Sequence, residues 1–275
     1  MTDTSAGPVA APLDDPFAQL TGSMAGTSRF QLEVVAAGQL SPHLRRVEFT
    51  AAGLGELEYR PGQDLMLLVE VEGNRPVRRR YTIRALDRAA GRLTIDVVLH
   101  GDGPGERWVR AARPGAVVEG IAPRGKVSPD PTADWHLFAG DESGLPAATV
   151  MAESLPATSA ALVILELPEE ADKQPIAAAA RLSTTWLPRD GRTAGDAAEL
   201  VRAVSDAPLP GGHGHAYLAG EARVVLALRD ALAARGLAPE QVSPKAYWGR
   251  GRANLGHGEP ARALPAPRAP RQPLS

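Results

Sequence analysis

The spacing of apolar residues changes once along the chain, near residues 129–134, and this change limits the possible folds more than any other feature. Before it, short runs of β-forming residues are separated by Gly and Pro, as in a small barrel or sandwich. Residues 92–99 show this best, because apolar and polar positions alternate there as in a half-buried strand. After the change, continuous apolar runs at 161–168 and 215–220 alternate with amphipathic segments, which is typical of a parallel sheet with helices.

The sequence therefore predicts a β domain followed by an α/β domain. We place the first at residues 28–131 and the second at 132–257. Residues 1–27 and 258–275 are predicted to be a flexible leader and a flexible tail, because both are rich in Ala and Pro without periodicity. Residues 221–236 are typical of the second domain, since they carry an apolar helical stripe and end on a glycine suited to a helix C-cap.

Composition excludes several classes of function. The 275 residues contain 30 Lys and Arg against 32 Asp and Glu, so the formal net charge of −2 offers no general attraction for nucleic acid or an anionic membrane. The absence of cysteine excludes disulfides, thiolate zinc sites, Cys-ligated iron–sulfur clusters and a cysteine nucleophile. No apolar run approaches the roughly 20 residues of a membrane helix, and the start of the chain lacks the features of a signal peptide. We expect a soluble, cytoplasmic and monomeric protein.

The first candidate for chemistry is a short run at the end of a predicted strand. Arg79, Tyr81 and Thr82 combine a forked cation for a phosphate, a flat ring for an aromatic ligand and a hydroxyl for a ring heteroatom. Taken alone, this run is more simply an exposed strand with basic side chains.

Two glycine-rich turns precede predicted helices. Residues 100–106 would expose backbone N–H groups at the start of a short helix, where a phosphate binds favourably, although such turns are common. Residues 139–146 do not match G-x-G-x-x-G, so the usual dinucleotide-binding fingerprint is missing. Asp141 and Glu142 could belong to a binding loop, but an acidic start of the helix explains them equally well as helix caps.

His213 and His215 could form a metal-binding pair. No third ligand is visible in the sequence, so a polar loop is the better interpretation. We predict no metal site.

The order of these motifs resembles that of the ferredoxin-reductase-like flavoproteins and, within them, the siderophore-interacting protein family, the NAD(P)H-dependent ferric-siderophore reductases. Further matching segments are HGDGPGERW, APRGK, LFAGDESGLPA, LVILELP followed by ADKQP, TTWLPR, YLAGE and AYWGRG. The resemblance extends from about residue 30 to residue 257 and depends on the order and spacing of the segments rather than on a single motif.

The resemblance implies a β + α/β fold, with a six-stranded antiparallel β-barrel flavin domain followed by a Rossmann-like α/β nucleotide-binding domain. It implies FAD and NAD(P)H as cofactors and no side chain as a catalytic group, because the flavin carries the electrons. The positions that it assigns to cofactor binding are Arg79, Tyr81, Thr82, Asp96, Val98, His100, Gly103, Pro104, Gly105, Glu106, Trp108, Gly140, Asp141, Glu142, Ser143 and Lys173.

The chain departs from the family pattern at Gly105 and Glu106, where the family usually has Ala-Ser. A carboxylate beside a pyrophosphate is unfavourable unless it points to solvent or pairs with Arg107. We therefore expect the substitution Glu106→Ser to leave FAD affinity unchanged or improved. Lys173 stands where relatives often carry an acidic residue, which favours NADPH over NADH unless this lysine is simply a solvated surface residue.

These inferences predict a reductase that passes electrons from NAD(P)H through FAD to Fe(III) in a siderophore complex and releases Fe(II). Ferric siderophores are commonly anionic, so Arg124, Lys245 and Arg250 are expected to line a positive cleft beside the flavin. Tyr247 and Trp248 are expected to pack the domain rather than to stack on a ligand. Two alternatives stay open: a reductase of the same architecture for another acceptor, and a non-enzymatic descendant that binds a siderophore or a flavin-like ligand.

Overall fold

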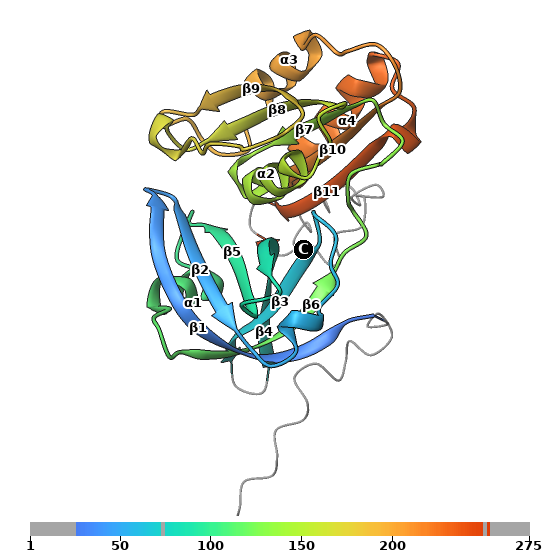
Figure 1. Cartoon of the computed structure of the whole chain (residues 1–275). Coiled ribbons are helices and arrows are strands. Elements are labelled where there is room, and N and C mark those ends of the chain that lie inside the picture. Colours follow the sequence, from blue (N-terminus) through green and yellow to red (C-terminus); the bar gives the residue numbers. More distant parts are fainter. Residues whose placement is uncertain (1–25, 73–74, 250–251, 254–275) are drawn as a thin grey trace, which may run out of the picture.

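The computed structural model describes residues 26–72, 75–249 and 252–253. The first part is a closed antiparallel barrel with the strand order β1-β2-β5-β4-β3-β6, which confirms the predicted barrel (Figure 1). Its strands are β1 (Ser28–Ser41), β2 (Leu44–Thr50), β3 (Asp64–Glu72), β4 (Arg75–Asp87), β5 (Arg92–Val98) and β6 (Val117–Arg124). Helix α1 (Pro104–Ala111) connects β5 to β6.

The barrel forms because alternate residues of each strand are apolar and point inward. On β5, Leu93, Ile95 and Val97 are buried, as the alternation in the sequence predicts. Helix α1 packs on the barrel through Trp108, whose ring stacks on Phe49 with 6.2 Å between the centroids. The start of α1 is thereby fixed close to the ends of β4 and β5.

The second part is a six-stranded sheet with the order β12-β11-β10-β7-β8-β9, which confirms the predicted α/β domain. The parallel strands are β7 (Trp135–Gly140), β8 (Ala160–Leu167), β9 (Arg181–Pro188), β10 (Gly214–Glu221) and β11 (Val242–Gly249), and the short β12 (Arg252–Ala253) pairs antiparallel with β11. The chain changes direction across the sheet between β7 and β10. Ligands of open α/β sheets bind beyond the carboxyl ends of the strands at such a point.

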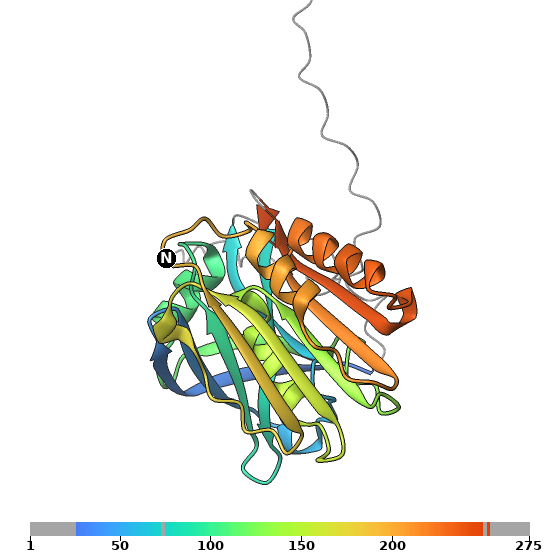
Figure 2. The same cartoon turned by 90° about the horizontal axis from the view of Figure 1, so that it is seen from above.

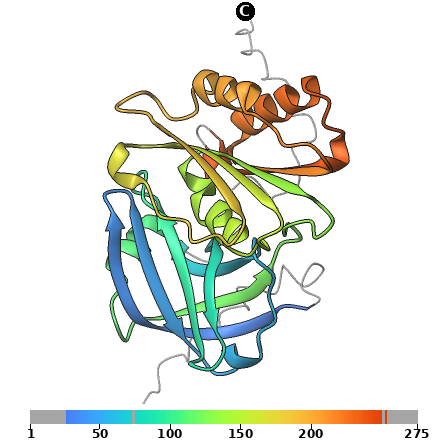
Figure 3. The same cartoon turned by 45° about the horizontal axis from the view of Figure 1, so that its top comes forward.

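Helices cover the two faces of this sheet unequally. Helices α3 (Ala198–Asp206) and α4 (Ala222–Ala234) lie on the outer face (Figures 1 and 2), whereas α2 (Leu145–Glu153) lies between the sheet and the barrel (Figure 3). In the sequence, Leu145, Ala148, Met151, Ala152 and Leu155 are spaced as one face of a helix, which predicts a single buried stripe. Residues 145–152 are all buried instead, because the barrel covers the face of α2 that the sheet leaves free.

Three kinds of contact join the two domains. Leu44 of the barrel lies in the same apolar cluster as α2, and Val98 packs against that cluster. Arg84 forms an ion pair with Glu153 at 2.7 Å. The turn between β1 and β2 hydrogen-bonds to Asp172, which lies in a short 3₁₀ helix, η4 (Glu170–Asp172), after β8. Among the described helices, none has the length and apolar character that crossing a membrane requires.

Candidate functional site

The predicted phosphate cation and aromatic residue lie together at the start of α1. Arg79 and Tyr81 are on the same face of β4 and contact Gly105 closely. A Cβ atom at position 105 would lie 2.5 Å from the Tyr81 hydroxyl and 2.9 Å from Cγ of Arg79, so only glycine fits without movement. Burial raises the pKa of Tyr81, which keeps its hydroxyl protonated. The structure therefore brings the first two sequence motifs into one site.

The guanidinium of Arg79 is open to a ligand. It donates to the carbonyl of Arg78 at 2.9 Å, and no carboxylate of the described residues pairs with it. The residue before helix α1 is Gly103, which has no side chain to cap the first turn, and the first helical residue is Pro104, which has no N–H group. The N–H groups of Gly105 and Glu106 thus have no side-chain cap. This donor set fits the diphosphate of FAD.

The carboxylate of Glu106 adopts neither of the two arrangements that would relieve its repulsion of a pyrophosphate. Its side chain neither points to solvent nor pairs with Arg107, because it is only 7% exposed and accepts hydrogen bonds from the backbone N–H groups of His100 at 2.6 Å and Gly101 at 2.8 Å. Arg107 pairs with Glu70 at 2.7 Å instead. The expected repulsion is reduced, since the carboxylate is turned toward the end of β5.

The remaining barrel positions occupy varied surroundings. Asp96 is buried and accepts two hydrogen bonds from Arg46, at 2.7 and 2.8 Å, so its carboxylate serves an ion pair within the barrel wall. Val98 packs toward α2. Thr82 is buried opposite Asp64 in the β3–β4 ladder. Trp108 faces the barrel core, where its ring stacks on Phe49.

The loop after β7 lies at the point where the sheet reverses direction. A Cβ atom at Gly140 would lie 1.7 Å from the carbonyl oxygen of Ala219, so the loop and the end of β10 touch. Asp141 caps the 3₁₀ helix η3 (Glu142–Gly144) by accepting from the N–H of Ser143 at 2.9 Å. The same carboxylate accepts from the N–H of Glu221 at 2.7 Å and from the indole of Trp248 at 3.0 Å. Complete burial and then the neighbouring Glu142 raise the pKa of Asp141 to about 7.

Glu142 belongs to a buried ion-pair cluster. Arg189, which follows β9, donates to Glu142 at 2.8 Å and to Glu166 of β8 at 3.1 Å. Burial raises the pKa of Glu166, and Arg189 opposes this shift. Sequence reasoning missed Arg189, although its position directly after a strand and next to acidic strand ends was a usable signal. Glu142 therefore binds a neighbouring side chain in this structure.

Lys173 lies after η4 and pairs with Glu170 three residues earlier. The adjacent Asp172, which the sequence did not single out, is buried and accepts from the Ser41 hydroxyl at 2.7 Å and from the His43 N–H at 3.0 Å. Burial favours its neutral form, but these hydrogen bonds outweigh burial and lower the pKa of Asp172. The loop expected to approach the nucleotide is thus attached to the barrel.

A cation cluster lies where the barrel meets the second domain. Arg80 donates to Asp64 at 2.9 Å, and the Lys245 ammonium lies 3.5 Å from the same carboxylate. Arg124 is buried beside Asp64 in the sheet register, and burial together with the charge of Arg80 lowers its pKa. Three cations thus share one carboxylate among the described residues. Arg250, the third predicted substrate cation, lies outside the described residues.

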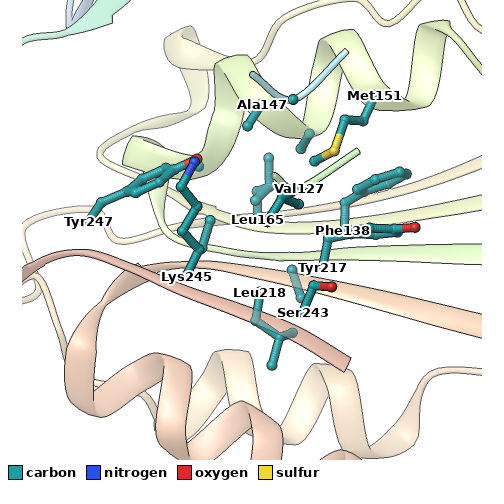
Figure 4. Close-up of a pocket in the computed structure, with 15 residues that line it drawn as sticks. Val127, Phe138, Ala147, Met151, Leu165, Tyr217, Leu218, Ser243, Lys245 and Tyr247 are labelled. Atoms are coloured by element: carbon teal, nitrogen blue, oxygen red, sulfur yellow. The ribbon is translucent and has the colours of Figure 1, made fainter. Parts of the chain in front are cut away.

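A cavity at the reversal point opens beside this cluster (Figure 4). Phe138, Met151 and Leu165 give it apolar walls, and Lys245 and Tyr247 lie at one end of it (Figure 4). Trp248 follows directly and stacks on His100 of the barrel, with 6.4 Å between ring centroids. The turn after β5, the loop after β7 and the cation cluster therefore meet at one interface between the domains.

The two predicted metal candidates lie at the opposite edge of the sheet. His213 and His215 both approach Asp130, at 3.9 and 3.6 Å, and His215 also contacts the Ser243 hydroxyl. These contacts account for both rings as a polar cluster at the start of β10.

The closed barrel followed by the parallel sheet is the ferredoxin-reductase-like fold. A ferredoxin reductase of carbazole 1,9a-dioxygenase, 20% identical in sequence, has this fold with a TM-score of 0.63. Residues 133–251 match the family model described as siderophore-interacting protein, and residues 68–127 match the siderophore-interacting FAD-binding domain. The chain belongs to the siderophore-interacting protein family, and its barrel is the FAD-binding domain.

Individual relatives agree with this assignment. A siderophore utilization protein from T. fusca is 30% identical, and its structure matches with a TM-score of 0.76 over 86% of this chain and 98% of that one. The ferric vibriobactin reductase ViuB of Vibrio cholerae is 34% identical over 74% of each chain. An NADPH-dependent ferric-chelate reductase of Escherichia coli is 28% identical over 66% of this chain and 70% of its own.

Proposed function

We propose that this protein is an FAD-dependent reductase that passes electrons from NAD(P)H to Fe(III) in a siderophore complex and releases Fe(II). One observation carries the proposal: the carboxyl ends of β7 and β10 meet a surplus of positive charge at the interface with the barrel, and the same barrel presents Arg79 without a carboxylate partner among the described residues. The names of the Vibrio cholerae and Escherichia coli relatives support ferric reduction.

The side chains bind and orient the reactants. Arg79 and the first-turn N–H groups of α1 would hold the FAD diphosphate, and Tyr81 offers a flat surface beside them. Bound FAD would accept a hydride and release single electrons, which is chemistry that no side chain here supplies. Because α1 adds phosphate donors to Arg79, we infer FAD rather than FMN. A released cofactor that chromatographs as FMN would contradict this choice.

For the nucleotide we infer NADPH rather than NADH. Lys173 lies in the loop after β8, at the carboxyl edge where nucleotides bind such sheets. Its present partner, Glu170, is exposed, so the ammonium can turn to a phosphate at little cost. We also infer a cytoplasmic location, where NADPH is supplied.

The substrate that we infer is an anionic ferric siderophore. In the part of the chain that the structure describes, Asp64 is the one carboxylate beside Arg80, Arg124 and Lys245, so an anion at this interface would gain attraction. A reductase of the same fold for an uncharged acceptor would gain nothing from this cluster. A non-enzymatic binding protein would take up FAD without being reduced by the nucleotide.

Spectroscopy tests the function in sequence. Purified protein titrated with FAD, then with NADPH under anaerobic conditions, should lose its oxidised-flavin absorbance and recover it on addition of a ferric siderophore. A ferrous chelator should then develop colour. Bleaching without recovery would indicate another acceptor, and absence of bleaching would indicate a binding protein.

Substrate charge is tested by the substitution Lys245→Ala, with the exposed Lys126→Ala as matched control. We expect Lys245→Ala to raise KM for an anionic complex several-fold while leaving flavin reduction by NADPH intact. Added salt should slow reduction of the anionic substrate, because ions in the solvent screen its attraction to the cluster over about 10 Å at 0.1 M while it approaches. Equal effects on an anionic and a neutral ferric complex would contradict the cationic site.

A further inference from the structure

The carboxylate of Glu106 closes the segment between β5 and α1 into a ring, which we call the cofactor turn (residues 99–106). Glu106 is the third residue of α1, a position from which a glutamate ordinarily reaches back to the residue that precedes the helix. Here it passes Gly103 and accepts from His100 and Gly101 instead. Two successive backbone N–H groups that converge on one anion form an anion-binding site. The side chain therefore fills an anion site that the backbone itself creates.

The first turn of α1 is held from two sides. On one side Gly105 rests against Arg79 and Tyr81, with no room for a Cβ atom. On the other side Glu106 binds the end of β5 through its carboxylate. With both sides fixed, the N–H groups of residues 105 and 106 keep their direction relative to the open guanidinium of Arg79. The donors for a phosphate are thereby arranged within the protein itself.

The same carboxylate also approaches a ring that contacts the second domain. The Nδ1 atom of His100 lies 3.3 Å from Glu106, and the imidazole stacks on Trp248. His100 is otherwise exposed, with 57% of its side chain accessible. Glu106 is therefore placed to orient both the backbone and the ring of His100 at the domain boundary.

We propose that Glu106 is a positioning residue that fixes the cofactor turn before FAD binds, by serving as an internal anion for the N–H groups of His100 and Gly101. The proposal rests on the proposed function in one respect, namely that this turn receives the FAD diphosphate. It reverses the expectation drawn from the sequence for Glu106→Ser. Removing the carboxylate takes the acceptor from two part-buried N–H groups and releases the turn, and we expect the lost order to weaken FAD binding more than the lost repulsion strengthens it.

Two variants and one control test the proposal in the full chain. Glu106→Gln keeps the size of the side chain but turns an amide NH₂ toward one of the two N–H donors, and Glu106→Ser removes both acceptors. The control is Glu70→Gln, which removes an exposed negative charge beside the same helix through its partner Arg107. Thermal melting of each variant establishes that it is folded.

The first readout is amide hydrogen exchange of residues 99–106 in FAD-free protein. We expect exchange at His100 and Gly101 to accelerate on the order of tenfold or more in both Glu106 variants, and to stay unchanged in Glu70→Gln.

The second readout is FAD affinity by titration of flavin fluorescence, which should weaken roughly tenfold in Glu106→Gln and further in Glu106→Ser. Unchanged exchange, or faster exchange with unweakened FAD affinity, would overturn the proposal. If the unaltered protein bound no FAD, the proposed function would fail, and the exchange experiment alone would decide whether Glu106 fixes the turn.

Discussion

The barrel site and the carboxyl edge of the sheet differ in whether their charged groups have partners within the protein. In the barrel, Arg79 has no carboxylate partner among the described residues, and the adjacent N–H groups of α1 are uncapped. At the sheet edge, Arg189 pairs with both Glu142 and Glu166, and Glu221 caps α4 by accepting from the N–H groups of Arg223 and Val224. The barrel site is therefore built to retain an anion. The charged groups of the sheet edge are paired within the protein, which on the proposed function would suit a nucleotide that binds and leaves in each cycle.

Removing the cation that pairs the carboxylates at the sheet edge should cause the largest loss of stability. Arg189→Met leaves two buried carboxylates without their cation, and we expect a loss of about 3–5 kcal/mol in the free energy of unfolding. Chemical denaturation measures this loss. The control Arg107→Met removes an exposed pair with Glu70 and should cost less than about 1 kcal/mol. Similar losses of stability in the two variants would show that the buried pairs of Arg189 contribute no more than the exposed pair of Arg107.

The buried carboxyl at the same edge should give the protein a specific pH dependence. The pKa of Asp141 is about 7 in the folded chain against 3.8 for the ordinary group, so the folded state binds the proton more tightly. Its contribution to stability is full below pH 3.8 and is lost as pH rises through about 7.

Asp141→Asn removes this dependence. The stability difference between the two proteins should change with pH between these values by at most about 1.4 kcal/mol per unit. Denaturation curves at several pH values measure it. Stability profiles that run parallel from acid to neutral pH would show that Asp141 titrates normally.

The open cation of the barrel should matter for the ligand and not for the fold. Arg79→Ala should weaken FAD binding by about 1.5–3 kcal/mol, because it removes a charge-assisted hydrogen bond to phosphate. Its melting temperature without FAD should stay near that of the unaltered protein, since no ion pair is lost. Flavin titration with the exposed Arg88→Ala as control makes the comparison. Equal affinities in the two variants would place the diphosphate elsewhere.

The smallest effect is expected at Lys173, which is exposed and already paired. Lys173→Glu should lower the preference for NADPH over NADH by roughly two- to fivefold, in line with the modest strength of exposed charge pairs. The ratio of kcat/KM for the two nucleotides measures this change, with Lys126→Glu as control. A ratio that stays constant would assign Lys173 to the solvated surface.

Elements with strong local patterns could be predicted from the sequence. The alternation in residues 92–99 and the continuous apolar run in 161–168 appear as β5 and β8. The prediction for α2 was incomplete, because the barrel that buries its second face lies far away in the chain. The motifs assigned Arg79 and Gly105 to the same cofactor site, and the structure places them in contact. The motifs could not show that the carboxylate of Glu106 binds backbone N–H groups, because those groups are brought to it only by the folded turn.

By itself, the sequence determined the two domains and the segments from which the site is built, because the period of apolar residues is a local property of each segment. Only the tertiary structure decided how the charges are partnered. Lys245 meets Asp64 across 181 positions, and Asp172 meets Ser41 across 131. Such pairs depend on which strand ends and turns converge when the domains pack. The energies of ion pairs and hydrogen bonds depend on the distance between the two groups. For residues far apart in the chain, no local sequence pattern encodes that distance.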